Sequence, residues 1–482
     1  MKRPAGNSLD LRAWLDVAKK LGELKEVPGA DAKLELGAIS ELNVKIDGAP
    51  ALLFDEIKGY PKGFRVLTCS TASPARLSSL LRLPVEHNHH GLVQKLRGKP
   101  RGWQAEAPKY DPVVVETGAV LENIQSGKDV DITIFPSPLW HEKDGGPYIG
   151  TGCCVVTRDF DSDWVNVGTY RVQVFDRNTV GLWISPGKHG RLIREKYFAR
   201  GLPCPVAISV GTDPLLFITA GNEIDFGVNE YAYAGGHRGR PFDVVESELH
   251  GLPIPANDEI VLEGEIMPDD VRTEGPFGEF TGYYASGEQS QPAVRIRRIY
   301  HRNDPIITTA RPGRPPHDFS FSKSVSKAAT IWEEMEKAGL PGVTGVWSHE
   351  AGGSRMFNVV AIKQMYPGHA RQAGHLAFAC HAGNYLGRWV VVVDDDIDPT
   401  NTFEVIWALS TRCDPATSID IIGKAWSGPL DPVLPKGVVE NSRAVIDACR
   451  PWSRKDSFPP VAEASKEVMA ETYKKWRFLL DQ

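Results

Sequence analysis

A dense run of short strand candidates in the middle of the chain limits most strongly how this sequence can fold. Between residues 113 and 310, turn signals separate short apolar stretches that show little helical periodicity. So many short strands with so little helix favour a barrel or a split barrel. The stretches that we predict to be strands are residues 154–157, 165–175, 181–185, 206–210, 215–219, 259–266, 293–300 and 306–309.

Helical patterns alternate with strands on both sides of this region. Leu11, Trp14, Leu15 and Ala18 recur at the spacing of an amphipathic helix. After a Pro-rich linker at residues 311–316, apolar strands and helical patterns follow one another, which predicts βαβ units and a largely parallel sheet. The predicted helices are 322–338, 369–385 and 402–411, the predicted strands are 343–347, 357–362 and 389–393, and a final helix covers 463–480.

These patterns together predict an α/β multidomain protein. The final helix is long enough to leave its own domain and pack on a neighbour. The expected parts are a mixed α/β unit at residues 1–112, a split β-barrel at 113–312, a C-terminal α/β oligomerisation domain at 317–450 and a C-terminal helix at 451–482.

Composition narrows the classes of partner. The 482 residues carry a net charge of −6, which argues against nucleic acid or an anionic membrane as the main partner. The first residues do not read as a secretory signal, and no stretch reaches the ~18 uncharged apolar residues of a membrane span. Seven dispersed cysteines without a C-x-x-C pair are typical of a cytoplasmic protein.

Two glutamates in the E-G-P-F-G-E segment at residues 274–279 are candidates for acid–base chemistry. Glycines and a proline lie between Glu274 and Glu279, so a turn could aim both carboxylates at one point. Two carboxyl groups in one apolar pocket cannot both ionise cheaply, and the one that keeps its proton becomes a general acid. The alternative is a surface turn with two solvated acids.

Three further places in the strand-rich region could carry chemistry. Arg171 lies among strand residues and needs a carboxylate or phosphate partner, although a salt bridge at a sheet edge would also satisfy it. The G-K-H-G segment at 187–190 can bring backbone close to a phosphate, or can form a hairpin turn. Glu230 opens a segment of small residues and could simply start a helix.

In their order and separation, these motifs resemble the UbiD-type decarboxylases, which use prenylated FMN. The matching motifs are N-x-x-x-x-R at 166–171, G-K-H-G at 187–190, E-Y-x-x-A-G-G at 230–236 and E-G-P-F-G-E at 274–279. His141 within residues 139–146, the stretch 255–264, and segments 394–398 and 407–412 of the last domain support the match. The resemblance covers most of the chain and is tightest from 139 to 283.

The resemblance implies roles for individual residues. Arg171, Glu274 and Glu279 match the catalytic Glu-Arg-Glu network, with Glu279 as the proton donor and Glu274 as the ionised partner of the arginine. A divalent ion, manganese or magnesium, would bridge the flavin phosphate to the protein, and a potassium ion would be held partly by backbone carbonyls of 220–230. The implied metal ligands are Asn166, His189 and Glu230; the implied cofactor-binding residues are Asn166, Thr169, Tyr170, Arg171, Lys188, His189, Glu230 and Arg388.

The resemblance also implies a function, which is the non-oxidative, reversible decarboxylation of an aromatic, heteroaromatic or α,β-unsaturated acid. The modified flavin would carry the electronic part of the reaction, a flavin prenyltransferase would supply it, and the protein would be a homodimer or hexamer. Phe280 and residues 407–412 are candidate pocket walls. The alternatives are a net carboxylase, a split-barrel redox protein with ordinary FMN, and a metallohydrolase. The Glu-Arg-Glu set argues against the second, and the lack of a water-activating base argues against the third.

Overall fold

The computed structural model describes residues 10–222 and 224–480, and its first part is a mixed α/β unit on a four-stranded sheet. Strand order is β1-β2-β3-β16, so one strand comes from much later in the chain. The strand predicted at 306–309 does not join the central sheet as expected, because β16 pairs in parallel with β3. The elements of this unit are α1 (Leu11–Lys20), β1 (Leu24–Pro28), α2 (Glu35–Asn43), β2 (Ala51–Asp55), β3 (Arg65–Thr68), α3 (Pro74–Leu80), α4 (His89–Leu96), α5 (Lys99–Glu106) and β16 (Ile306–Thr308).

The amphipathic pattern at the start of the chain is confirmed as α1. The side chain of Asp10 caps this helix by accepting a hydrogen bond from the Ala13 backbone N–H at 2.9 Å. Its apolar stripe is buried against the rest of the unit, as the spacing predicts. The buried residues are Leu11, Trp14, Leu15 and Ala18.

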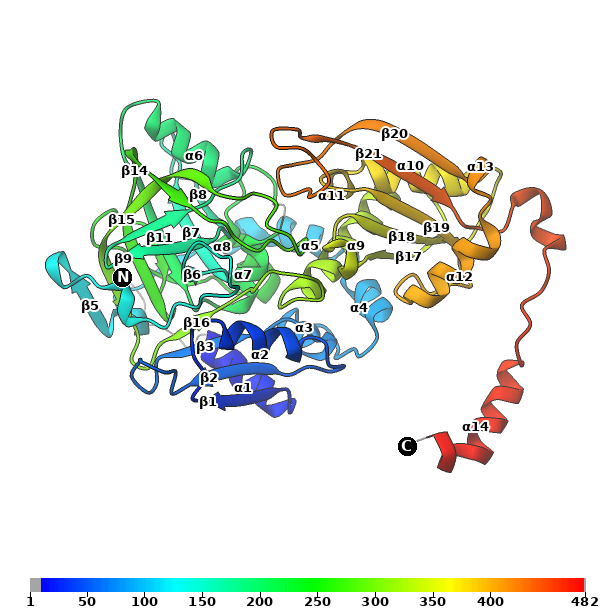
Figure 1. Cartoon of the computed structure of the whole chain (residues 1–482), viewed down its shortest axis with the longest axis horizontal. Coiled ribbons are helices and arrows are strands. Elements are labelled where there is room, and N and C mark those ends of the chain that lie inside the picture. Colours follow the sequence, from blue (N-terminus) through cyan, green and yellow to red (C-terminus); the bar gives the residue numbers. More distant parts are fainter. Residues whose placement is uncertain (1–9, 223, 481–482) are drawn as a thin grey trace.

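The middle part of the chain forms a nine-stranded sheet that curls into a half-barrel, at the left in Figure 1. Its main path is β6-β9-β10-β15-β14-β11-β7-β8, with β5 paired to β15, and β4, β12 and β13 form a separate small sheet. The elements are β4 (Val113–Val114), β5 (Asn123–Ser126), β6 (Tyr148–Gly150), β7 (Cys153–Arg158), β8 (Val165–Gly168), β9 (Val172–Asp176), β10 (Thr179–Leu182), α6 (His189–Phe198), β11 (Cys204–Val210), α7 (Pro214–Ala220), α8 (Glu230–Arg238), β12 (Asp243–Glu246), β13 (Pro253–Pro255), β14 (Ile260–Glu274) and β15 (Gln289–His301).

The single strand predicted at 165–175 is wrong, because the chain forms two strands there. β8 pairs with β7 at one end of the sheet path, whereas β9 pairs with β6 and β10 at the other end. The three residues between them, 169–171, therefore connect the two ends of the curled sheet. Arg171 is the last of these three residues, so it lies where the half-barrel is open and not within a strand.

The strand predicted at 215–219 is also wrong, because this stretch belongs to helix α7. Asp213 caps the helix by accepting the Leu215 backbone N–H at 2.9 Å, and Pro214 occupies the first turn. A short apolar run has no periodicity that separates a buried helix from a strand. The Asp-Pro pair before it is the signal that favours the helix.

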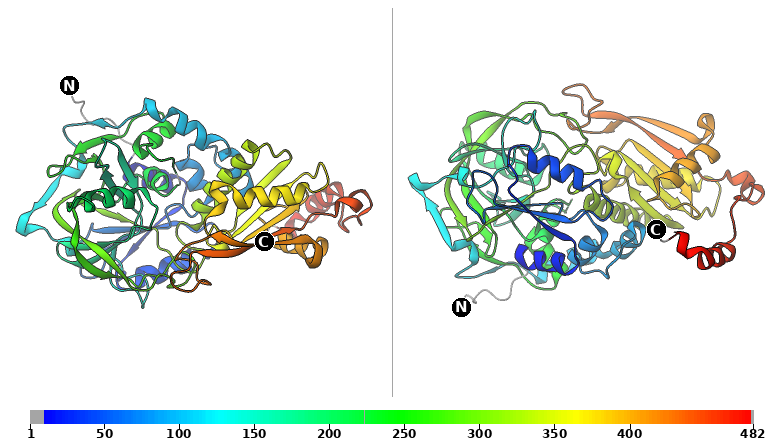
Figure 2. Two further views of the ribbon diagram at one scale, coloured as in Figure 1. Left: turned by 90° about the horizontal axis from the view of Figure 1, so that it is seen from above. Right: turned by 60° about the horizontal axis from the view of Figure 1, so that its bottom comes forward.

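A five-stranded sheet forms the C-terminal part of the body, beside the half-barrel (Figure 2). Its order is β17-β18-β19-β21-β20; the two inner pairings are parallel and the two outer ones antiparallel, so the largely parallel sheet that we predicted is a mixed one. The predicted helix 369–385 is two helices. The elements are α9 (Ser320–Lys337), β17 (Val343–Ser348), β18 (Phe357–Ile362), α10 (His369–Ala379), α11 (His381–Asn384), β19 (Trp389–Asp394), α12 (Thr402–Arg412), α13 (Pro415–Ser418), β20 (Ile419–Trp426), β21 (Glu440–Asp447) and α14 (Lys466–Leu480).

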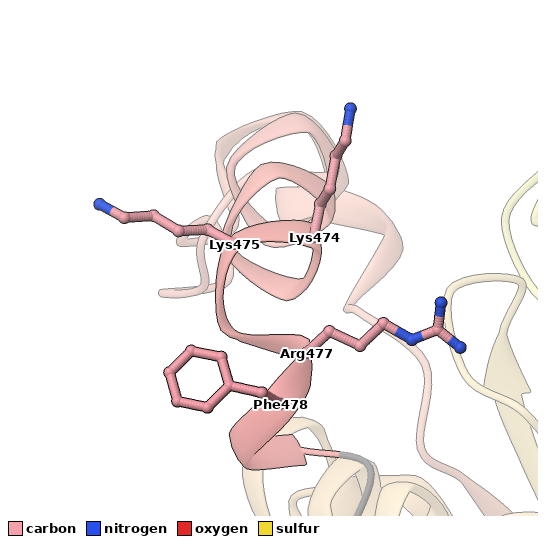
Figure 3. Close-up of a pocket in the computed structure, with 4 residues that line it drawn as sticks. All are labelled: Lys474, Lys475, Arg477 and Phe478. Carbon is pink, nitrogen blue, oxygen red and sulfur yellow. The ribbon is translucent and has the colours of Figure 1, made fainter.

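Helix α14 stands away from the rest of the molecule at the end of an extended segment (Figure 1). Figure 3 shows Lys474, Lys475, Arg477 and Phe478 pointing in different directions around this helix. Throughout residues 10–222 and 224–480, none of the helices combines the length and apolar character that crossing a membrane requires.

Candidate active site

Arg171 and the two glutamates of the 274–279 segment meet at one buried point. Arg171 Nε and NH2 donate to the two carboxylate oxygens of Glu274, each at 2.7 Å, and NH1 contacts Glu279 Oε1. The structure thus brings together the three residues expected to form the catalytic network. A salt bridge at an exposed sheet edge is excluded for Arg171, because its side chain is only 7% exposed.

The two glutamates come from opposite sides of a tight turn. Glu274 ends strand β14, and the left-handed backbone of Gly275, with φ of 82°, begins the turn that leads to Glu279. Glu274 is fully buried and Glu279 is 6% exposed, so the alternative of two solvated acids is wrong. Tyr148 Oη donates to Glu274 Oε1 at 3.1 Å, and Ser286 Oγ donates to Glu279 Oε1 at 3.2 Å.

The carboxyl groups of Glu274 and Glu279 have different electrostatic surroundings. Burial raises the pKa of Glu279, and the Arg171 charge opposes that rise. Glu274 accepts two hydrogen bonds from the charged Arg171 guanidinium, one on each carboxylate oxygen. Burial alone would lower the pKa of Arg171, but Glu279 and Glu274 raise it above its ordinary value. The site therefore holds one two-point Arg171–Glu274 ion pair and one carboxyl group, that of Glu279, biased toward keeping its proton.

A second polar group lies at the start of helices α6 and α8. Asn166 on β8 donates from Nδ2 to Glu230 Oε1 at 2.7 Å, and the Val167 backbone N–H donates to Glu230 Oε2 at 2.8 Å. Burial raises the pKa of Glu230 to about 8. His189 is the first residue of α6, which packs against β8, and burial lowers its pKa, so its imidazole is neutral at pH 7.

Asn166 and Glu230, which contact each other, offer an amide oxygen and a carboxylate to a divalent cation, and His189 would add an imidazole from the start of α6. The Oδ1 atom of Asn166 is buried and has no hydrogen-bond partner among the described residues. An amide oxygen, a neutral imidazole and a carboxylate together suit manganese or magnesium. In the described part of the chain, no group of three or more His, Cys, Asp or Glu side chains could hold a metal. A cation here would therefore depend on the amide oxygen of Asn166.

Of the other predicted cofactor residues, the Tyr170 side chain and Lys188 lie at the start of α6, and Arg388 lies in the C-terminal domain. Tyr170 Oη accepts the Gly190 backbone N–H at 3.2 Å, which ties the 169–171 connection to α6. The G-K-H-G segment is thus the start of a helix, and the hairpin alternative is wrong, with Lys188 at the N-cap of α6. Arg388 instead pairs within the C-terminal domain, where NH2 contacts both oxygens of Asp431 at 2.6 Å.

Comparison with known proteins identifies the chain's relatives. Sequence models of three 3-octaprenyl-4-hydroxybenzoate carboxy-lyase domains match it: the N-terminal domain at residues 15–96, the Rift-related domain at 113–315 and the C-terminal domain at 321–448. The chain belongs to the UbiD family. The remaining residues of the site are therefore those of a UbiD carboxy-lyase.

Individual UbiD relatives and structures match over most of their lengths. The chain is 34% identical over 424 residues to a pyrrole-2-carboxylic acid decarboxylase of Pseudomonas aeruginosa, covering 85% of this chain and 84% of the relative. The open form of the vanillic acid decarboxylase of Sedimentibacter hydroxybenzoicus is 30% identical, with a TM-score of 0.84 over 98% of this chain and 100% of that one. An evolved dimeric form of the UbiD-class enzyme HmfF of Pelotomaculum thermopropionicum, in complex with prFMN, is 27% identical, with a TM-score of 0.79 over 95% of this chain and 97% of that one.

Several residues of this UbiD site were not visible from sequence. Trp183 and Phe277 lie against the Arg171 guanidinium, at 5.2 and 4.9 Å from the ring centroids to Cζ. Tyr148 holds Glu274 from a distant segment of chain, and Ser286 holds Glu279 from seven residues further along. The only local signal is a hydroxyl on an otherwise apolar strand, as at Tyr148 on β6.

The two predicted pocket walls differ in their placement. Phe280 faces the C-terminal domain, where the Arg355 guanidinium lies 5.6 Å from its ring centroid. Residues 407–412 lie on α12, at the end of the C-terminal domain away from the half-barrel (Figure 1). There Arg412 pairs with Asp394 and Asp396. We therefore retain Phe280 as a wall and withdraw 407–412.

Proposed function

We propose that this protein decarboxylates an aromatic, heteroaromatic or α,β-unsaturated carboxylic acid, reversibly and without net oxidation, with prenylated FMN as cofactor. The observation that carries the proposal is Arg171 held between the buried Glu274 and Glu279. Support comes from the P. aeruginosa relative, a pyrrole-2-carboxylic acid decarboxylase, and from HmfF in complex with prFMN. Net carboxylation is the same chemistry in reverse, and product analysis under high bicarbonate tests its direction.

The half-barrel, in our proposal, is a split barrel that binds the flavin across its open side. Prenylated FMN, when bound, supplies the electron sink that the loss of CO2 requires. Asn166, His189 and Glu230 would hold manganese or magnesium against its phosphate, and carbonyls of residues 220–230 would hold potassium. Thr169, Tyr170, Arg171 and Lys188 would line the flavin. Arg388 remains the weakest member of this set, because Asp431 engages its guanidinium.

The protein's own part of the reaction is to orient the acid, exclude water and return a proton. Arg171, fixed by Glu274, orients the substrate carboxylate and keeps a positive charge next to the proton donor. The Glu279 contacts with Arg171 and Ser286 both go to Oε1, so Oε2 is the oxygen that carries the proton. That proton passes to the carbon that has lost CO2. Phe277 is 3% exposed and shields the pair from water.

The substrate is tested by a panel of acids. Flavin-loaded protein is incubated with pyrrole- and furan-carboxylic acids, hydroxybenzoic acids and cinnamic acids, and CO2 release is measured for each. We expect release from at least one aromatic or heteroaromatic acid, because these are the compounds that the relatives' names specify. Release from none of them by flavin-loaded protein would contradict the proposed function.

The proposed metal site is tested by Glu230→Gln. Gln keeps the size of the side chain but removes its charge, and we expect manganese affinity to fall by about 100-fold, because a carboxylate ligand is lost. Calorimetric titration of metal-free protein with Mn²⁺ measures this. The control is Glu195→Gln, because Glu195 is an exposed acid on α6 that pairs with Arg191, one turn earlier in the same helix. Unchanged Mn²⁺ affinity in Glu230→Gln would rule out this ligand.

The proposed homodimer, or a hexamer built from dimers, is tested on α14. Six apolar side chains of this helix are between 42 and 69% exposed, more than a helix of an isolated chain would leave uncovered. They are Val468, Met469, Tyr473, Trp476, Phe478 and Leu479. We expect removal of residues 463–482 to lower the mass measured by light scattering, whereas exchange of Lys474 and Lys475 to Gln leaves it unchanged. A truncated chain of unchanged assembly state would contradict this role.

A further inference from the structure

The loop at residues 141–146 packs backbone to backbone against the turn that carries the proton donor. The Gly145 N–H donates to Pro276 O at 2.8 Å, and the Gly278 N–H donates to Asp144 Oδ1 at 3.0 Å. A Cβ atom on Gly145 would lie 2.0 Å from Gly275 O, so no larger residue fits there. The turn that ends at Glu279 is therefore held from outside, by a neighbouring loop.

His141 links this loop to a buried arginine. Its Nδ1 lies 3.3 Å from Asp144 Oδ2, and its Nε2 lies 3.0 Å from Arg311 NH1. Because a guanidinium can only donate, Nε2 must accept, and the imidazole proton sits on Nδ1, facing the carboxylate. Arg311 donates to His141, and His141 donates to Asp144. Asp144 also accepts the Gly278 N–H.

Arg311 stands at the start of the linker that leads to the C-terminal domain. Its side chain is 1% exposed, and its backbone N–H donates to Asp318 Oδ2 at 3.1 Å, just before helix α9. NH1 also donates to Pro312 O at 3.2 Å and lies 3.8 Å from Glu41 of α2. One guanidinium thus contacts the linker, the N-terminal unit and the loop behind the catalytic turn.

We propose that His141 and Asp144 are positioning residues for the proton donor Glu279, and that Arg311 ties their arrangement to the interdomain linker. The inference rests on the proposed function and names residues beyond the Glu-Arg-Glu set. Glu279 directly follows Gly278, and glycine gives the backbone at that position no side chain to fix it. The hydrogen bond from Gly278 to Asp144 supplies that constraint, and the neutral His141 keeps Asp144 in place.

Asp144→Asn tests the link with almost no change in shape. The Asn Oδ1 can still accept from Gly278, but its NH2 group then faces the donor Nδ1 of His141. A change of imidazole tautomer would only turn a second donor toward Arg311, so one donor pair stays unsatisfied in either case. His141→Ala removes the imidazole from the link and leaves only the backbone N–H of residue 141, which donates to Asp144 Oδ2 at 2.9 Å. His141→Gln can restore the side-chain part, because one amide can accept from Arg311 and donate to Asp144. Glu142→Gln, an exposed acid of the same loop, is the control.

The expected result is a loss in kcat with little change in KM. A displacement of about 1 Å at the proton donor lowers the rate by about 100-fold, so Asp144→Asn and His141→Ala should lose about that much, and His141→Gln should regain about tenfold. Flavin absorbance and flavin content stay at wild-type values, and Tm falls by no more than a few degrees, because an unsatisfied donor pair costs only a small part of the folding free energy. Wild-type kcat in both variants would overturn the proposal. So would a parallel loss of Tm and flavin content without rescue by Gln, because that pattern marks a general folding role.

A second readout does not depend on activity. Crystal structures of wild type and His141→Ala are compared at the Glu279 carboxylate relative to Arg171. We expect a shift of about 1 Å in the variant, and an unshifted carboxylate would overturn the positioning role. If the wild type releases no CO2 from any acid, the proposed function fails while this comparison still decides the positioning role. If the wild type is active and the variants equal it, only the positioning role fails.

Discussion

Glu279→Gln is expected to lower kcat for decarboxylation by at least about 1,000-fold while prenylated FMN still binds. The Gln carbonyl can still accept hydrogen bonds from Arg171 and Ser286, so the site keeps its shape. Its amide cannot give up a proton to the carbon that has lost CO2, so turnover stops at that step.

Two measurements on the same samples check this result. CO2 release gives the rate, and the absorbance spectrum gives the flavin content. Glu288→Gln is the control, because this acid is exposed and lies in the segment that follows the catalytic turn. Near-native decarboxylation by Glu279→Gln, on any accepted acid, would remove Glu279 from its role.

Arg171→Met is expected to abolish activity and to lower the free energy of unfolding by about 3–5 kcal/mol. The substitution leaves Glu274 and Glu279 buried without their counter-ion, and a buried carboxylate without a partner is strongly unfavourable. Arg177→Met is the control. Its side chain is 63% exposed and pairs with Asp131, and such surface pairs contribute about 0–1 kcal/mol.

The loss in Arg171→Met should grow as the pH rises. Burial already raises the pKa of Glu279, and removal of the arginine takes away the charge that opposes this rise. A carboxyl group with a pKa of about 4.3 in the unfolded chain and a higher pKa in the folded protein binds more protons when folded. Stability is therefore lost as the pH rises through the folded pKa. Urea unfolding at pH 5.5 and 8 tests this. A loss of unfolding free energy equal to that of Arg177→Met, or a loss that becomes smaller as the pH rises, would contradict the account.

The sequence predicted which residues form the site better than where those residues lie in the fold. From the residues alone, Arg171 and the two glutamates were separate candidates, and only the resemblance to the UbiD-type decarboxylases joined them in one network. The place of Arg171 between β8 and β9 could not be read from local pattern, because residues 165–175 carry strand-like residues throughout and only long-range pairing separates the two strands. In the same way, the apolar run at 215–219 fits a strand or a helix equally well.

The residues that hold the site come from parts of the chain that no short motif connects. Tyr148 reaches Glu274 across 126 positions, and Arg311 reaches His141 across 170. Such contacts arise from packing of whole domains. Strands β20 and β21 were missed for a related reason: exposed and polar positions interrupt their apolar pattern, which only pairing within the sheet completes.

The most direct test of prenylated-FMN decarboxylation compares the protein produced with and without a flavin prenyltransferase. Both samples are given the same panel of acids in D2O, and CO2 release and the deuterium content of the product are measured. The account predicts CO2 release only from the sample made with the prenyltransferase, with deuterium at the carbon that lost the carboxylate. Equal release from protein that carries ordinary FMN, or no release from the loaded protein on any acid, would contradict it.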